Sequence, residues 1–351
     1  MITVIESSRI HRAKRAFVTR NVARDHLRLL QSSPGNIKSG DLVLARVGKI
    51  GHHKALELTT GRRSIMHEGD EILVAYGNRY APDQYEAMVP KEMATCGLVA
   101  AGGIASQALS WSTRISAPTS IEPIGLVCGA DGEVINLSGY AVEELVVSSL
   151  PQVIAVAGSS MNAGKTTTVS NLVRGLTRQG YRVGAVKITG TGAGGDLWKM
   201  RDAGAIAAVD FTDAGMASTF NMPLPRLYEA ATHLIAHLAA KQCDVIVMEI
   251  ADGIYQQESA AFIQSPFMQN LISAYLFAAD GSTGAAAGVA WLQRFGRVLA
   301  VSGKVTASPL ASREAEQVTG LSCYTSAQLA QGDVTKGWLE MLEADPLRAV
   351  L

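Results

Sequence analysis

The sequence predicts an α/β fold in two parts: a β-rich N-terminal domain over residues 1–150 and, over residues 151–351, a domain with a mostly parallel sheet. Two observations lead to this prediction. From Gln152 onward, nearly continuous apolar runs alternate with helical patterns, as expected when helices cover both faces of a parallel sheet. In the first third, short apolar runs are separated by turns rich in glycine and aspartate, which favours a small barrel or sandwich.

The composition limits the kinds of partner and the cellular compartment that we expect for this chain. The chain has 351 residues, of which 48% are hydrophobic, and its 31 basic residues balance its 31 acidic ones. A protein whose main partner is nucleic acid usually carries an excess of basic residues, so we do not expect nucleic acid to be a partner of this chain. The first residues lack the apolar core of a signal peptide, and no run of about twenty apolar residues suits a membrane span. The four cysteines form no CxxC pair. We therefore expect a cytoplasmic protein.

The elements of the first domain follow from local patterns. Apolar positions with helical spacing predict one amphipathic helix over residues 9–31. Short apolar or alternating runs predict the next three strands, at "DLVLARVGKI" (41–50), "KALELTT" (54–60) and "EILVAYG" (71–77).

Three polar segments of the first domain concentrate histidine, arginine and tyrosine: "GHH" (51–53), "GRR" (61–63) and "GNRYAPDQYE" (77–86). We favour solvated turns as their interpretation. The other interpretation is that the arginine pair binds a carboxylate or a phosphate. A metal site at the histidines would need a third ligand, which the sequence does not identify.

The second domain reads as strand, loop, helix and strand in repetition. Spacings of about 30 residues or more between strands suit βαβ crossovers. A helix is predicted within "LYEAATHLIAHLAAKQ" (227–242), and the strands are predicted at "VIAVAG" (153–158), "RVGAVKI" (182–188), "DVIVMEI" (244–250), "AYLFAA" (274–279) and "RVLAVSG" (297–303).

The segment "GSSMNAGKTTT" (158–168) lies between the first of these strands and a helical stretch. A strand, a glycine-containing loop and a helix N-terminus form the context of a phosphate-binding loop, where backbone N–H groups and the helix dipole attract anionic oxygens. Lys165 can reach the outer phosphates and Thr167 can donate to the inner one. The residues expected to hold a nucleotide are Gly158, Ser159, Ser160, Met161, Asn162, Ala163, Gly164, Lys165, Thr166 and Thr167.

Three side chains are candidates for binding Mg²⁺. The Thr166 hydroxyl can ligate the ion, and Glu249 ends a buried strand, where an unpaired carboxylate would be costly. Asp196 follows glycines 190–195, which predict a mobile loop that closes over a substrate. Asp196 has two compatible interpretations, a helix N-cap and a contact to Mg²⁺ or substrate.

The loop resembles that of the dethiobiotin synthetases, which also carry an early glycine followed by Gly-Lys-Thr. "VGAVKITGTG" (183–192) and "VIVMEIADG" (245–253) are similar to two further segments of that family. The resemblance implies that Lys187 helps hold substrate and phosphate and that Glu249 is the acidic Mg²⁺ ligand. Ser160 and Asn162 stand where that family carries carboxylates. Related enzymes often complete their sites across a dimer, so a homodimer stays open.

The chain as a whole resembles the P-loop family DUF1611, some members of which look like amino-acid N-acetyltransferases. This resemblance implies an alternative, in which the loop holds the phosphates of acetyl-CoA. A second alternative is a nucleotide-dependent switch or maturation factor. Our main prediction is an ATP- and Mg²⁺-dependent enzyme that transfers a phosphoryl group to, or ligates, a small carboxylate or amine metabolite. Its catalytic residues would be Lys165, Lys187 and Glu249. No Asn-Lys-x-Asp pattern for reading guanine is present, so a dedicated GTPase is not predicted.

Overall fold

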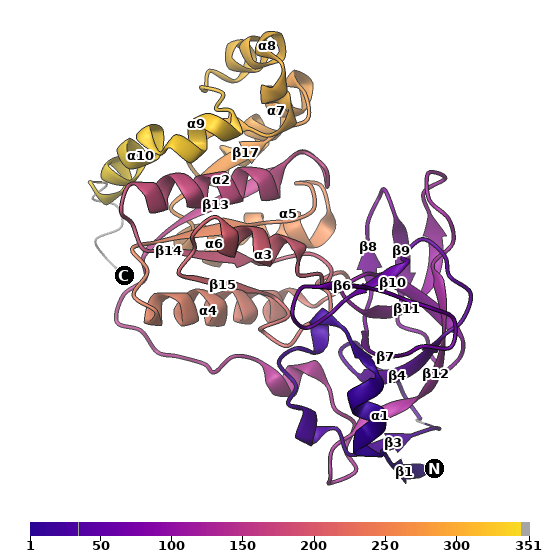
Figure 1. Cartoon of the computed structure of the whole chain (residues 1–351). Helices are drawn as coiled ribbons and strands as arrows, with labels where there is room; N and C mark the ends of the chain where they lie inside the picture. Colours follow the sequence, from indigo (N-terminus) through magenta and orange to yellow (C-terminus); the bar gives the residue numbers. More distant parts are fainter. Residues whose placement is uncertain (34, 345–351) are drawn as a thin grey trace. The chain divides into compact units, whose positions relative to one another are not determined.

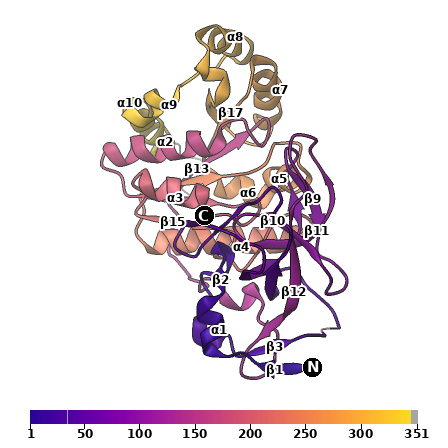
Figure 2. The ribbon, with the colours of Figure 1, turned by 45° about the vertical axis from the view of Figure 1, so that its right-hand side comes forward.

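The structure is a computed structural model that describes residues 1–33 and 35–344. The chain forms two compact units, drawn in Figure 1 and, turned by 45°, in Figure 2. Unit 1 consists of Met1–Val142, Gly190–Gly195 and Phe211–Met222. Unit 2 consists of Glu143–Thr189, Asp196–Asp210 and the chain from Pro223 onward. Two short segments that follow the phosphate-binding loop in the chain therefore belong to unit 1.

Unit 1 is built on a closed ring of strands. Successive hydrogen-bonded pairs run from β12 to β4, β7, β11, β10 and back to β12, and only the β7–β11 pair is parallel. Closure removes the unpaired edges that an open sheet would expose. The ring confirms the small barrel expected from the sequence. Its strands are β4 (Leu42–Val47), β7 (Glu71–Tyr76), β10 (Cys96–Ala100), β11 (Ile104–Trp111) and β12 (Thr119–Cys128).

Further short strands extend this sheet or lie beside it. β3 joins β12 and pairs with β1, β9 joins β11 and pairs with β8, and β2 pairs with β7. β5 and β6 form a separate antiparallel pair. Their bounds are β1 (Ile2–Val4), β2 (Lys14–Arg15), β3 (Leu29–Gln31), β5 (Ala55–Glu57), β6 (Arg63–Ile65), β8 (Arg79–Tyr80) and β9 (Tyr85–Met88).

The helix predicted over residues 9–31 is wrong for most of that range. The helix α1 (Ser7–Arg12) is short, and the chain continues through β2, two short 3₁₀ helices (Phe17–Thr19 and Arg24–His26) and β3. The apolar residues of this stretch are buried, but they lie on separate short elements and not on one helical face. Phe17, for example, is fully buried in the first 3₁₀ helix. After Arg12, the pairing of β2 with β7 and of β3 with β12 therefore overrides the helical pattern of the sequence.

Unit 2 contains a six-stranded sheet in the order β15-β14-β16-β13-β17-β18, and every pair in it is parallel. Together with unit 1, this sheet confirms the predicted α/β fold. The sequence analysis did not predict β15, which has only four residues. The strands are β13 (Gln152–Gly158), β14 (Val183–Lys187), β15 (Ala207–Asp210), β16 (Val245–Glu249), β17 (Ala274–Ala278) and β18 (Val298–Ser302).

The helices of unit 2 pack on this sheet through apolar faces. α2 contacts β13, β14 and β16, α4 contacts β14 and β15, and α7 contacts β17 and β18. In α2, Val169, Leu172, Val173 and Leu176 recur at helical spacing and are fully buried. The bounds are α2 (Lys165–Arg178), α3 (Gly195–Asp202), α4 (Leu224–Ala240), α5 (Gln257–Gln264), α6 (Pro266–Leu271), α7 (Ser282–Leu292), α8 (Pro309–Thr319), α9 (Ser326–Gln331) and α10 (Asp333–Glu343).

The glycine-rich segment Gly190–Gly195 packs closely within unit 1. A Cβ at Gly192 would lie 2.4 Å from Val18 Cγ1, and the Gly194 N–H donates to the Glu57 carboxylate at 2.9 Å. Glycine is needed where backbone and side chain approach this closely. Across the described part of the chain, no helix is both long and apolar enough to cross a membrane.

Candidate functional site

The loop between β13 and α2 has the backbone geometry of an anion cradle. Gly164 has a φ of +103°, a left-handed conformation that favours glycine, and it immediately precedes α2. Among the described residues, the backbone N–H groups of Gly164, Lys165, Thr166 and Thr167 donate to no backbone carbonyl. These donors lie at the positive end of the α2 dipole, so the arrangement suits anionic oxygens.

The early glycine of the loop, Gly158, has a steric reason. A Cβ at this position would lie 2.8 Å from the Lys165 Cγ and 2.9 Å from the Ala278 carbonyl oxygen. Glycine at the end of β13 therefore leaves room for the Lys165 stem beside the neighbouring strand. Ser159 occupies the first position of the usual loop pattern without a positive φ, and its hydroxyl donates to the Asp280 carboxylate at 3.0 Å.

Lys165 lies under the loop with 3% of its surface exposed. Its ammonium group donates to the Ser160 carbonyl oxygen at 2.6 Å and to that of Met161 at 3.4 Å. Burial lowers the pKa of Lys165, and the Glu249 and Asp252 carboxylates only partly oppose this shift. The lysine is thus held by neutral carbonyl groups inside the loop, where an anionic ligand would be a stronger partner.

The three predicted metal ligands meet at the carboxyl ends of neighbouring strands. Glu249 ends β16 and is in register with Val156 of β13 and Lys187 of β14. The Thr166 hydroxyl donates to Glu249 Oε1 at 2.8 Å. Asp196 lies close enough to Glu249 for its negative charge to raise the pKa of Glu249. The fold thus brings Thr166 and Glu249, which are 83 positions apart in the chain, into direct contact.

The second carboxylate oxygen of Glu249, Oε2, is buried without a hydrogen-bond partner among the described residues. Glu249 is only 2% exposed, and burial raises its pKa although Lys187 acts in the opposite direction. A buried carboxylate oxygen without a partner is costly and fits a cation. This oxygen and the Thr166 hydroxyl are the donor chemistry that Mg²⁺ prefers. In the described part of the chain, no cluster of three or more His, Cys, Asp or Glu side chains suits a metal.

Lys187 and Asp196 form a direct ion pair within unit 2. Burial lowers the pKa of Lys187, but the Asp196 and Glu249 carboxylates outweigh burial and raise it above its usual value. Burial raises the pKa of Asp196, but Lys187 outweighs burial and holds it below its usual value. Both side chains are therefore charged at neutral pH, and Asp196 is the direct partner of Lys187.

The remaining loop residues have structural partners. Ala163 is fully buried, and its carbonyl oxygen accepts from the Lys304 N–H at 2.9 Å. The Ser160 hydroxyl donates to Asp280 at 3.2 Å, and the Thr167 carbonyl oxygen accepts from Asn171 at 2.8 Å. Met161 is half-buried and Asn162 is exposed.

The sequence analysis did not identify Asp280, which holds both Ser159 and Ser160 of the loop. Asp280 follows β17, the strand paired with β13 on the side opposite β16. Its signal in the sequence is a carboxylate directly after the buried run "AYLFAA". Carboxyl ends of parallel strands meet at one edge of a sheet, so Asp280 was a predictable neighbour of the loop.

One family model matches the chain. Residues 153–261, less than a third of the chain, match MobB, described as "Molybdopterin guanine dinucleotide synthesis protein B". The match spans β13, the loop, β14 and β16. Unit 2 contains a P-loop nucleotide-binding domain of the NTPase type. No curated protein matches the chain.

Solved structures that resemble the chain have low similarity to it. The 54 kDa signal recognition particle protein from Aeropyrum pernix, in complex with GDP, has a TM-score of 0.37 and 18% identity, covering 56% of this chain and 49% of its own. The signal recognition particle receptor FtsY from Elizabethkingia anophelis has a TM-score of 0.33 and 16% identity, covering 59% of this chain and 65% of its own. The matched part thus spans about half to two thirds of these proteins.

Proposed function

We propose that the chain is an ATP- and Mg²⁺-dependent enzyme that transfers a phosphoryl group to, or ligates, a small carboxylate or amine metabolite. The observation that carries the proposal is the contact between Thr166 and Glu249 beside the P-loop. It combines a phosphate cradle with a buried carboxylate that has one oxygen left for a cation. A cradle that only held the phosphates of a carrier such as acetyl-CoA would not require that carboxylate.

The phosphates would be bound by the loop and by Lys165. The backbone N–H groups of Gly164–Thr167 would donate to phosphate oxygens, and the Lys165 ammonium would exchange its carbonyl partners for an outer phosphate. Lys187 is protonated beside Asp196 and would offset negative charge on the transferred group. Catalysis of this kind depends on positioning and on electrostatic stabilisation.

Thr166, Glu249 and Asp196 would hold Mg²⁺. Bound there, the ion would neutralise charge on the phosphate oxygens of the nucleotide. The Thr166 hydroxyl and the Glu249 carboxylate are already in contact at 2.8 Å, so this part of the site is preorganised. Asp196 would contribute from the N-terminal turn of α3.

ATP is the proposed nucleotide because the chain lacks an Asn-Lys-x-Asp pattern that reads guanine. The matching family carries "guanine dinucleotide" in its name, so GTP is the appropriate competitor in any binding assay. If the chain binds GTP more tightly than ATP, the proposed phosphoryl transfer stands and GTP replaces ATP as the proposed nucleotide.

The test is phosphate release from ATP·Mg²⁺ by the purified full chain, measured with pools of small carboxylic acids and amines. We expect release to depend on one such metabolite and to stop in a Lys165→Ala variant. Release stimulated only by another protein would instead support a nucleotide-dependent switch. Transfer from acetyl-CoA to an amine without ATP would overturn the proposal in favour of an acetyltransferase.

A further inference from the structure

The three polar segments that the sequence marks in the first domain line a single cavity within unit 1. The cavity has a volume of about 480 Å³. "GHH" contributes His52 and His53, "GRR" contributes Arg63, and "GNRYAPDQYE" contributes Arg79 and Gln84. The other lining residues are Lys54, Ala55, Ala100, Ala101, Thr191 and Ala193. A cavity of this size suits a small metabolite.

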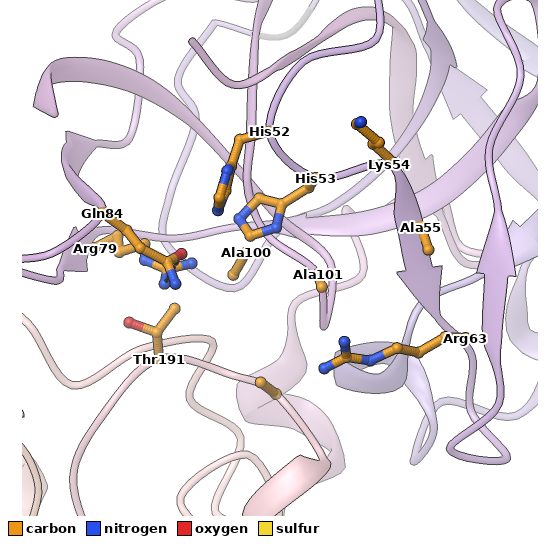
Figure 3. Close-up of a pocket in the computed structure, with 11 residues that line it drawn as sticks. His52, His53, Lys54, Ala55, Arg63, Arg79, Gln84, Ala100, Ala101 and Thr191 are labelled. Carbon is orange, nitrogen blue, oxygen red and sulfur yellow. Dashed lines mark hydrogen bonds between the residues drawn. The ribbon is translucent and has the colours of Figure 1, made fainter. Parts of the chain in front are cut away.

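The cavity wall is cationic. Lys54, Arg63 and Arg79 carry positive charge, and none of the lining residues is an aspartate or a glutamate. Figure 3 shows the guanidinium group of Arg63 directed into the space beneath His53, with Arg79 and Gln84 on the other side of it. The ammonium group of Lys54 points away from them. Clustered cations around a partly enclosed space raise the local potential and attract anions.

Arg79 is the buried anchor of this wall, with 7% of its surface exposed. Its guanidinium donates to Gln84 Oε1 at 2.8 Å and to the Val99 carbonyl oxygen. These contacts through Nη1 and Nη2 fix the plane of the guanidinium, and each of these nitrogens carries a second N–H donor. A guanidinium binds a carboxylate or a phosphate with two parallel hydrogen bonds. Thr191 lies next to Arg79 and Gln84 in Figure 3 and also lines the cavity.

His53 completes the wall as a neutral ring. Its Nε2 lies 3.0 Å from the Val99 carbonyl oxygen, which can only accept, so Nε2 carries the proton and donates. Burial lowers the pKa of His53 to about 4, and the neighbouring Arg79, His52 and Arg63 lower it as well. The ring of His52 contacts that of His53 edge-on, with centroids 5.0 Å apart. An anion bound beside Arg79 would therefore raise the pKa of His53.

We propose that this cavity binds a small organic anion, whose carboxylate or phosphate oxygens are held by Arg79 and Arg63. The site lies entirely in unit 1 and does not depend on the nucleotide chemistry proposed for unit 2. Arg79 supplies the fixed, buried contact, and Arg63 supplies a second charge from β6 at the edge of the cavity. A carboxylic acid and a phosphate ester both supply such oxygens, and the experiment separates these two sources.

The test uses the full chain and four probes: succinate, citrate, inorganic phosphate and glycerol phosphate. Succinamide and glycerol are the uncharged controls. Calorimetry measures affinity, and NMR of the histidine ring protons, with His53 assigned through a His53→Gln variant, reports binding at the cavity. The variant Arg63→Gln removes an exposed side chain, so its folding is not at risk, whereas Arg79→Gln removes buried hydrogen bonds. Arg62→Gln is the matched control, since Arg62 does not line the cavity.

We expect at least one anion to bind with a dissociation constant of about 1 mM or tighter. Its affinity should fall about tenfold in Arg63→Gln and stay unchanged in Arg62→Gln. Bound anion should also raise the pKa of His53, because it offsets the charge of Arg79. Binding of the carboxylates alone assigns a carboxylic acid, and binding of the phosphates alone assigns a phosphate ester. The proposal is overturned if no anion binds, if the uncharged probes bind equally, or if Arg63→Gln binds as well as the wild-type chain. ATP affinity measured in the same variants keeps this result separate from the proposed function.

Discussion

The Thr166 hydroxyl donates a 2.8 Å hydrogen bond to Glu249 Oε1, while Oε2 of the same carboxylate is buried without a partner among the described residues. The two side chains come from the start of α2 and the end of β16. A helix N-terminus that offers free N–H groups and a strand end that offers a carboxylate thus meet at one point. Phosphate and cation require these opposite chemistries side by side.

Replacing Glu249 with Gln should weaken binding of ATP in the presence of Mg²⁺ by about tenfold or more, because the amide cannot ligate the ion as a carboxylate does. The dependence of affinity on Mg²⁺ should largely disappear. Calorimetric titrations with and without Mg²⁺ measure this. Glu229→Gln, an exposed change on α4, is the control and should behave as the wild-type chain.

The same substitution should not destabilise the ligand-free protein at neutral pH. Burial raises the folded-state pKa of Glu249, so its contribution to stability is present below its unfolded pKa and is lost as pH rises through the folded value. At neutral pH the buried charge is therefore a cost that Gln removes. Urea unfolding should show a free energy of unfolding at least equal to that of the wild-type chain. A large loss would contradict the description of Glu249 as an incompletely paired carboxylate.

Replacing Lys165 with Ala should lower ATP affinity by about a hundredfold, since a buried ammonium facing the phosphates is lost. The fold should persist, because the lysine is held only by loop carbonyl groups. Circular dichroism checks the fold and calorimetry checks the affinity. Lys241→Ala removes an exposed lysine at the end of α4 and should leave both unchanged. Unaltered ATP affinity in a folded Lys165→Ala variant would refute its role.

Asp196→Asn should reduce the free energy of unfolding by about 2 kcal/mol at neutral pH, because it leaves the buried Lys187 without its carboxylate. Lys187 holds the pKa of Asp196 below its usual value, so the wild-type advantage is present above the unfolded pKa. It should be lost as pH falls through the folded value. Unfolding by urea at a series of pH values tests this. A constant difference between the two proteins down to strongly acidic pH would disagree with the ion pair.

His53 should make the protein less stable on mild acidification. Its folded-state pKa of about 4 lies below the usual value, so the unfolded chain gains a proton first as pH falls. Between about pH 7 and about pH 5 this should cost about 2 kcal/mol. His53→Gln should remove that loss, whereas His67→Gln, an exposed change, should retain it. If the free energy of unfolding fell equally with pH in the wild-type chain and in His53→Gln, His53 would not be a buried neutral ring.

The sequence predicted much of unit 2 because a parallel sheet leaves strong local marks. Buried strands are continuous apolar runs, so the sequence places Lys187, Glu249 and the loop after β13 at the carboxyl ends of their strands, where the structure has them. β15 was missed because four residues, half of them alanine, give a weak apolar run. Asp280 belongs to no recognisable motif, and only the pairing of β17 with β13 brings it to Ser159 and Ser160.

Unit 1 was less accessible to prediction because its contacts join distant segments. The helix expected over residues 9–31 gave way to strand pairing that no local pattern reveals. The cationic cavity unites residues 52–54, 63, 79, 84 and 191. The sequence around the first four of these sites suggests solvated turns, and that around residue 191 suggests a mobile loop. Closure of the barrel and the inclusion of Gly190–Gly195 in unit 1 bring them together.

The most direct test of the central claim is calorimetric titration of the full chain with ATP·Mg²⁺ and, separately, with acetyl-CoA. The P-loop, Lys165 and the Thr166–Glu249 pair predict that ATP binds in a Mg²⁺-dependent manner and that Lys165→Ala weakens this binding by about a hundredfold. Tight binding of acetyl-CoA with no binding of ATP would contradict the account.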